Sequence, residues 1–119
     1  VIVTTTKGVL RKIEALKPEL ERLKKKGVKI RIAAPLTKEI LTTVPDLQKI
    51  AEVKDSKNVN ARFCIVDGKE LMFMLLNDDE VHPTYDVGVW IDTPYFASAV
   101  ETMFNANWEN MPEASKVLK

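Results

Sequence analysis

One short stretch constrains the fold more than any other, residues 60–76, NARFCIVDGKELMFMLL. Two apolar runs flank Asp67-Gly68, a pair that favours a type I′ turn because both central positions of that turn need positive φ. The stretch therefore predicts two antiparallel strands joined by a two-residue turn. Because LMFMLL is apolar on both faces, we expect its strand to be central in the sheet.

Residues before this hairpin alternate between strand and helix patterns. VIVTT at the start and VKIRIAAP over residues 28–35 favour strands. Between them, apolar residues recur at helical spacing, with Thr6 as the expected N-cap and Pro18 as a kink or break. That apolar stripe consists of Leu10, Ile13, Leu16, Leu20 and Leu23. Two short helical pieces broken around Pro45 follow, and then a small edge strand, EVKD.

The residues after the hairpin predict an acidic loop, a strand VGVWI and a final helix that begins at Thr93 and Pro94. The expected apolar face of that helix is Phe96, Val100, Met103, Phe104 and Trp108. This order of elements predicts one α/β sandwich over residues 1–119, with a mixed sheet and helices on both faces. A chain of this length can bury a core without metal or disulfide support.

Cysteine usage and hydropathy limit the setting. Cys64 is the only cysteine, so a disulfide framework is excluded, and a reducing, cytoplasmic location is expected. No apolar run approaches the roughly 18–20 residues that span a bilayer. The chain opens on an apolar run without an initiator Met, which indicates an excised domain with a segment before Val1.

The charge is unevenly distributed. Residues 7–31 hold ten Lys and Arg against three Glu, whereas no Lys or Arg lies between Lys69 and Lys116. The basic stretch is interpreted as a solvated helix face, since no aromatic residues are interleaved for nucleic-acid binding. A partner-binding scaffold that uses this face is a further possibility.

Three residues of the hairpin stretch resemble a hydrolase motif. Asn60, Arg62 and Asp67 have the spacing of the His-x-Lys-x-x-x-x-Asp motif of the phospholipase D superfamily. In that family the His attacks phosphorus and the Lys holds phosphate oxygens. Asn cannot form a phosphoenzyme, Arg replaces Lys, and Met74-Leu75 stand where the family often has Gly-Ser. We therefore expect no catalysis, and an alternative interpretation makes Arg62 and Asp67 purely structural.

A closer resemblance extends over the whole chain. The hairpin, the acidic loop, VGVWIDTPYF and the ending ETMFNANWENM together resemble the phospholipase D-like domain of TrmB-type archaeal transcriptional regulators. The resemblance implies a winged helix-turn-helix DNA-binding domain upstream. It also implies a homodimer, because single phospholipase D-like halves commonly pair across the motif face. Sugar-responsive members carry a further C-terminal domain, so sugar sensing is not implied.

Two mechanisms and one competing class remain open. The domain either holds two DNA-binding heads at fixed spacing, or also senses a small polar or anionic effector in a vestigial pocket near Asn60 and Arg62. The competing class is a diverged phosphodiesterase or nuclease half domain that completes its site across a dimer. No cofactor is implied.

His82, the only histidine, lies in the acidic stretch DDEVHPTYD over residues 78–86. A zinc or hard-cation site can be built from such residues, but their spacing matches no standard metal loop. The stretch is interpreted as a solvated acidic loop without a metal. Cys64 is interpreted as a packed core residue of its strand.

Overall fold

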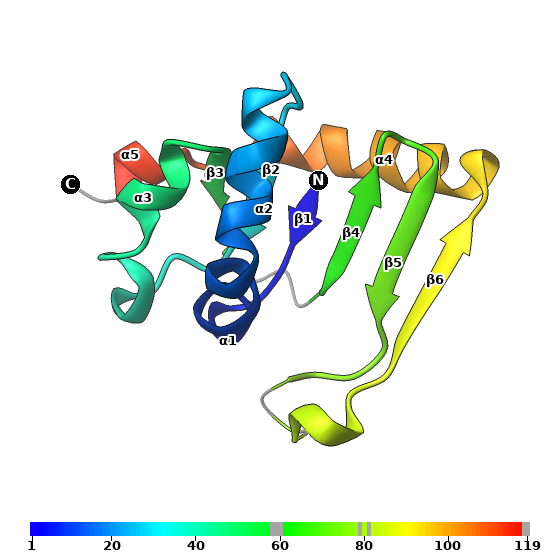
Figure 1. The fold of residues 1–119 in the computed structure, drawn as a ribbon, viewed down its shortest axis with the longest axis horizontal. Helices are drawn as coiled ribbons and strands as arrows, with labels where there is room; N and C mark the ends of the chain where they lie inside the picture. The colour runs from blue at the N-terminus through cyan, green and yellow to red at the C-terminus, as the bar shows by residue number, and fades with distance from the viewer. Residues whose placement is uncertain (58–60, 79, 81, 118–119) are drawn as a thin grey trace.

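The computed structural model describes residues 1–57, 61–78, 80 and 82–117. Six strands form one sheet in the order β3-β2-β1-β4-β5-β6. The sheet is mixed and helices lie on both of its faces (Figure 1), which confirms the predicted α/β class. Within the described residues, no helix is long and apolar enough to cross a membrane.

The elements follow the predicted order. The strands are β1 (Ile2–Val3), β2 (Arg31–Ala34), β3 (Glu52–Asp55), β4 (Phe63–Val66), β5 (Glu70–Met74) and β6 (Gly88–Asp92). The α-helices are α1 (Thr6–Gly8), α2 (Glu14–Lys25), α3 (Val44–Gln48), α4 (Pro94–Trp108) and α5 (Ala114–Val117). The other helical turns are the π-helical turn η1 (Val9–Ile13) and the 3-10 turns η2 (Lys38–Ile40) and η3 (Pro83–Tyr85).

The short strand β1 joins two halves of the sheet. It pairs in parallel with β2, which pairs in parallel with β3. On its other side β1 pairs antiparallel with β4, and β4, β5 and β6 form an antiparallel meander. The sheet therefore changes from parallel to antiparallel at β1, the strand that leads directly into α1.

The predicted hairpin forms, with one more residue in its turn. Asp67 and Gly68 have φ of 54° and 65°, as a type I′ turn requires, and the Lys69 N–H donates to the Val66 carbonyl at 3.0 Å. Val66 pairs with Glu70, so the loop contains three residues and the prediction of a two-residue turn is wrong. Lys69 is the additional residue.

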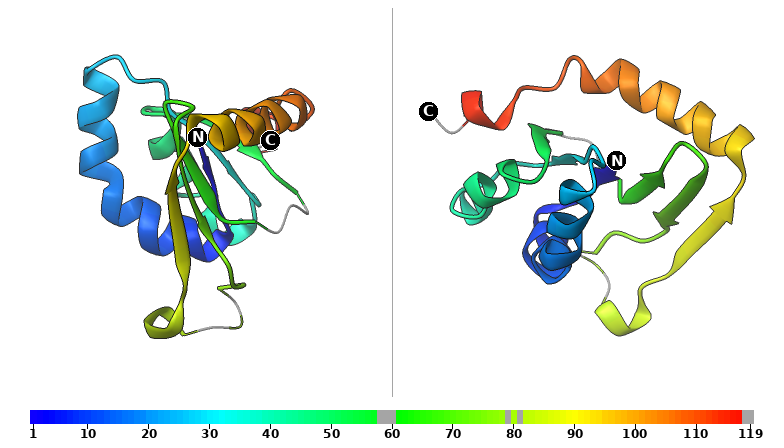
Figure 2. Two further views of the ribbon diagram at one scale, coloured as in Figure 1. Left: turned by 90° about the vertical axis from the view of Figure 1, so that its right-hand side faces the viewer. Right: turned by 45° about the horizontal axis from the view of Figure 1, so that its top comes forward.

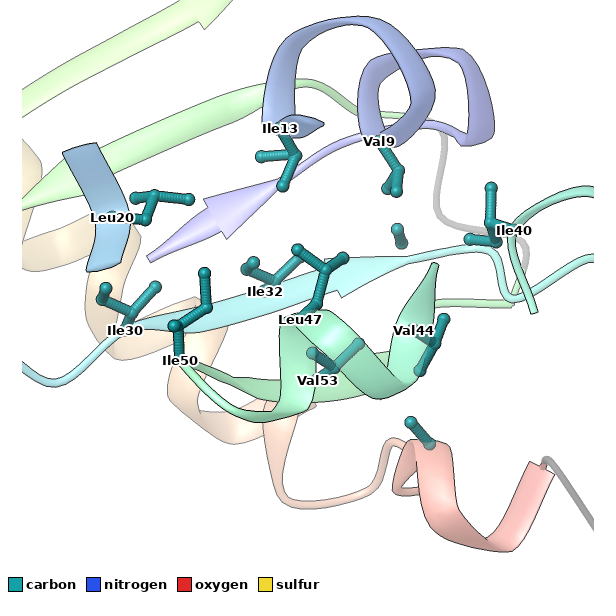
Figure 3. Packing of buried hydrophobic residues seen from close by; sticks show 12 residues of the cluster. Val9, Ile13, Leu20, Ile30, Ile32, Ile40, Val44, Leu47, Ile50 and Val53 are labelled. Atoms are coloured by element: carbon teal, nitrogen blue, oxygen red, sulfur yellow. The ribbon is translucent and has the colours of Figure 1, made fainter. Parts of the chain in front are cut away.

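The largest core cluster lies where η1, α2, η2 and α3 cover β2 and β3. Figure 3 shows side chains from these elements pointing at the same strip of sheet. Its members include Val9, Ile13, Leu20, Ile32, Ile40, Val44, Leu47 and Val53. The second face of the sheet packs against α4, through one cluster around Val3 and Phe104 and another around Ile65, Leu71 and Ala97.

Helix α4 differs from its predicted apolar face. Ala97, Phe104 and Trp108 are buried, whereas Phe96 and Met103 are 46% and 61% exposed, so their prediction as core residues is wrong. The small side chain of Ala97 lets the first turn of the helix approach Ile65 and Leu71 closely. The buried stripe therefore runs through Ala97 instead of Phe96.

Two basic residues fix the second half of α4 to the sheet. The Arg31 guanidinium lies 5.2 Å from the ring centroid of Phe104 and 5.6 Å from that of Trp108, and it donates to Asn105 Oδ1 at 2.7 Å. Lys54 Nζ lies 4.7 Å from the Trp108 ring centroid and donates to the Trp108 carbonyl at 3.0 Å. Cation–π attraction thus adds to apolar burial at this contact.

The sheet face that carries the large cluster is covered over only half its width. One cross-strand row runs from β2 to β6 through Ile32, Ile2, Cys64, Met72 and Trp90. Ile32 is fully buried, but Met72 is 47% and Trp90 65% exposed, because the helices on this face pack over β2 and β3. Strand β5 is internal, as predicted, but only one of its faces is buried.

The first helical segment begins one residue earlier than predicted. The Gly8 N–H donates to Thr5 Oγ1 at 3.1 Å, so Thr5 acts as the N-cap, and Thr6, the predicted N-cap, is the first residue of α1. Pro18 lies inside α2 without breaking it, and Figure 2 shows that the segment changes direction between α1 and α2, at the π-helical turn. Pro18 has no N–H, so the Glu14 carbonyl, four residues earlier, lacks its usual helical donor. The π-helical turn ends directly before Glu14, at the place where this hydrogen bond is missing.

Gly8 gives a direct test of how β1 meets α1. A Cβ at position 8 would lie 1.8 Å from Thr4 Oγ1 and 3.1 Å from Thr4 Cβ. Gly8→Ala normally stabilises a helix, yet here we expect a loss of about 1–3 kcal/mol in the free energy of unfolding, because Thr4 is buried. Urea denaturation measures the loss. In the Thr4→Ala background the same substitution should cost less, and equal costs in both backgrounds would contradict the proposed contact.

Candidate functional site

The structure separates the residues of the degenerate motif. Asn60 lies outside the described residues. Arg62 immediately precedes β4 and Asp67 immediately follows it, so the two side chains lie at opposite ends of the strand and are not brought together. Asp67 instead borders a polar hollow of about 930 Å³ at the opposite end of the strands, which Arg31 and Glu101 also line.

Arg62 is buried against a carboxylate of its own chain. Its side chain is 6% exposed, and Nη1 and Nη2 donate to Asp86 Oδ2 and Oδ1 at 2.7 and 2.8 Å. Nη2 also donates to the Leu76 carbonyl. This bidentate geometry is the one that guanidinium groups use to hold carboxylates and phosphates. The Asp86 carboxylate therefore occupies the position at Arg62 where an external anion would bind.

The Asp86 carboxylate has two further partners. The Val87 N–H donates to Asp86 Oδ1 at 3.1 Å, and Lys12 Nζ lies 3.8 Å from Oδ2. The hydrogen bonds from Arg62 lower the pKa of Asp86 below its usual range, and the same bonds raise the pKa of Arg62. Both groups are therefore charged across the physiological range.

A second polar contact links the acidic loop to the start of α1. Thr5 Oγ1 donates to Asp78 Oδ2 at 2.5 Å, and Lys7 Nζ donates to the Asp78 carbonyl at 3.5 Å. The other carboxylate oxygen, Asp78 Oδ1, is buried without a hydrogen-bond partner among the described residues. Asp78 and Asp86 thus tie the two ends of the loop to α1, η1 and β4.

An apolar groove of about 130 Å³ lies beside the Arg62–Asp86 pair. Its walls come from η1 and α2 on one side and from β4 and β5 on the other. Lys12 and Arg62 are its charged lining residues. The apolar lining comprises Ile2, Val3, Ile13, Leu16, Phe63, Cys64, Met72 and Met74. The π-helical turn contributes Lys12 and Ile13, and such turns occur frequently at functional sites. Burial raises the pKa of the half-buried Cys64 thiol, which keeps it protonated.

His82 does not belong to a metal cluster in the described structure. It is exposed, its Nδ1 accepts the Thr84 N–H at 3.2 Å, and its ring contacts the Tyr85 ring edge-on. Among the described residues, no group of three or more His, Cys, Asp and Glu side chains is placed to hold a metal ion.

Sequence reasoning identified Arg62 but missed Asp86, Lys12 and Asp78 as its surroundings. One signal was available, since a basic residue at the start of an apolar strand needs a buried counter-charge. The sequence offers several acidic residues after β5, and only the path of the chain shows that Asp86 is the one that returns to Arg62.

Comparison with known proteins supports the fold. No protein-family model and no curated protein matches this sequence. Among solved structures, the chain is similar to TrmBL2, described as an archaeal chromatin protein with a novel mode of DNA binding, with a TM-score of 0.70 and 21% identity. The match covers 94% of this chain and 44% of TrmBL2, so the chain corresponds to less than half of that protein. This likeness shows that the chain shares the fold of the matching part of TrmBL2.

The Arg62–Asp86 pair gives a stability test. Because Asp86→Ala leaves the Arg62 charge buried and unpaired, we expect it to lower the free energy of unfolding by about 2–4 kcal/mol; the partial exposure of Asp86 places this below the cost for a fully buried pair. Removing both side chains should cost less than the sum of the two single substitutions. Urea denaturation of the two single variants and the double variant measures this coupling, and additive losses would show that the pair does not form.

The pH dependence of stability follows from the lowered pKa of Asp86. A carboxylate whose folded-state pKa lies below its unfolded-state value stabilises the fold above the unfolded-state pKa. That contribution is lost as the pH falls through the folded-state pKa. We therefore expect the stability difference between the parent and Asp86→Asn to be constant near neutral pH and to shrink in acid. A difference that grows in acid would contradict this sign.

Proposed function

We propose that this chain is the regulatory and dimerisation domain of a TrmB-like DNA-binding regulator, with a phospholipase D-like fold that has lost catalysis. The likeness of its fold to TrmBL2, across nearly the whole chain, carries this proposal. In this function the domain holds two DNA-binding heads at a fixed spacing, which dimeric helix-turn-helix proteins need in order to meet successive half-sites.

The chemistry at Arg62 supports the non-catalytic part of the proposal. Position 60 is Asn, which supplies no titratable nucleophile, and both Nη atoms of Arg62 bind Asp86. The alternative, a diverged phosphodiesterase or nuclease half domain, requires Arg62 to hold a phosphodiester. It predicts turnover of a generic substrate such as bis(p-nitrophenyl) phosphate that disappears in Arg62→Ala.

The same site supports a sensing role for a small anionic effector. An effector that replaces Asp86 at Arg62 would release the loop before β6, and an effector that contacts Lys12 would enter beside the apolar groove. Either event couples ligand binding to the position of an element, as a ligand-driven population shift requires. A DNA partner would be bound by a domain outside residues 1–119.

Sedimentation velocity and DNA binding test the main proposal. The 119-residue chain should form a homodimer, and the longer protein that contains it should bind duplex DNA through a winged-helix segment before Val1. A monomeric chain at about 100 μM, well above the dissociation constants of most stable complexes, contradicts the dimerisation role. Hydrolysis of the phosphodiester that depends on Arg62 would favour the enzyme instead.

Anion rescue tests the sensing role. Asp86→Ala frees the Arg62 guanidinium, so phosphate should raise the melting temperature of this variant, and the stabilisation should grow logarithmically once the phosphate concentration exceeds its dissociation constant. The double variant Arg62→Ala, Asp86→Ala is the control and should not respond. A response in the parent chain would identify the anion as able to displace Asp86, whereas no response in the parent or in Asp86→Ala would remove the anion-sensing hypothesis.

A further inference from the structure

The two edge strands of the sheet, β3 and β6, differ in whether another segment covers them. At the β3 edge, the Asp55 N–H donates to the Pro112 carbonyl at 2.9 Å, and the backbones of Lys54 and Glu113 form an isolated antiparallel β-bridge, so the segment after α4 covers that edge. At the other end of the strand order, β6 has β5 as its only strand neighbour among the described residues. Figures 1 and 2 show no helix or strand along its outer side.

The pattern of hydrogen bonds identifies which groups of β6 point outward. The Leu75 N–H donates to the Val87 carbonyl at 3.0 Å, which makes residues 75 and 87 a hydrogen-bonded pair. Such pairs alternate along an antiparallel ladder, so Val89 and Ile91 also direct their backbone groups at β5. Gly88, Trp90 and Asp92 therefore present their N–H and C=O groups at the open edge.

Strand β6 lacks the features that usually block pairing at an edge. Natural edge strands carry Lys, Pro, bulges or inward charges that prevent association with another strand. The sequence of β6 is Gly-Val-Trp-Ile-Asp, and its register against β5 is continuous over all five residues. Trp90 is 65% exposed, and exposed apolar residues also lie just outside both ends of the strand, Val87 at 46% and Tyr95 at 89%.

We propose that two copies of this chain associate through β6, which pairs antiparallel with β6 of the second copy about a two-fold axis at Trp90. This inference rests on the dimerisation role in the proposed function and specifies its contact. The pairing joins the two sheets into one continuous sheet. Gly88 of each copy then faces Asp92 of the other, Trp90 faces Trp90, and all outward backbone groups of these three residues find partners.

The residue pattern of β6 fits a second copy of itself. On the face of the sheet that α4 covers, Val89 of one copy lies opposite Ile91 of the other, so apolar side chains meet in both directions. On the opposite face the two indole rings lie side by side and extend the exposed row that Met72 begins. Asp92 lies opposite a glycine, so no like charges face each other. An isologous interface requires this kind of self-complementarity.

Amide hydrogen exchange and sedimentation equilibrium, both on the 119-residue chain, test the inference. The N–H groups of Gly88, Trp90 and Asp92 should become protected as protein concentration rises, because only pairing of the edge covers them. Trp90→Lys places a charge on the two-fold axis and should weaken dimerisation at least about tenfold. Met72→Lys is the control, since Met72 is exposed on the same face but lies on the internal strand β5.

The outcomes separate this inference from the proposed function. Concentration-dependent protection of the three amides, with a weaker dimer in Trp90→Lys than in Met72→Lys, supports pairing through β6. A stable dimer in which these amides exchange freely, or in which Trp90→Lys has no effect, overturns the inference and leaves the dimerisation role intact. A chain that stays monomeric overturns both.

Discussion

The bidentate ion pair between Arg62 and Asp86 links the two ends of the antiparallel meander β4–β6, the half of the sheet that η1, α2, η2 and α3 do not cover. Arg62 stands at the start of β4 and Asp86 just before β6, so their contact closes the loop that follows β5 back onto the first strand of the meander. Lys12, in the π-helical turn, forms an ion pair with the same carboxylate. The Asp86 carboxylate thus contacts groups at the start of β4, in its own loop and in the π-helical turn.

This contact also explains why a basic residue can stand at position 62 of the motif-like set. A guanidinium buried at this position needs an anion, because an unpaired charge in a largely apolar site is costly. Asp86 supplies that anion in the folded chain, and Asp67 forms the hairpin turn at the other end of β4. Arg62 and Asp67, the two described residues of the motif-like set, therefore have structural contacts of their own, and any effector at Arg62 has to compete with a carboxylate of the same chain.

The sequence was sufficient for features that depend on local chemistry. Positive φ at Asp67 and Gly68 follows from the turn preference of that pair, and the Pro94 start of α4 follows from the tolerance of the first helical turn for proline. Features that depend on distant partners could not be derived. The choice of Ala97 over Phe96 for burial depends on how closely α4 approaches β4 and β5. The burial of Trp108 against Arg31 and Lys54 depends likewise on two strands from another part of the chain.

The pKa of the Asp86 carboxyl, measured by a carbon-13 NMR titration of the folded chain, tests the central claim most directly. If Arg62 holds Asp86 as its resident anion, the midpoint lies below the usual range of an aspartate, because protonation must break the bidentate contact. The midpoint should return toward the usual range in Arg62→Met. A midpoint at or above the usual range in the parent chain would contradict the account, since it would leave the Arg62 site open to an external anion.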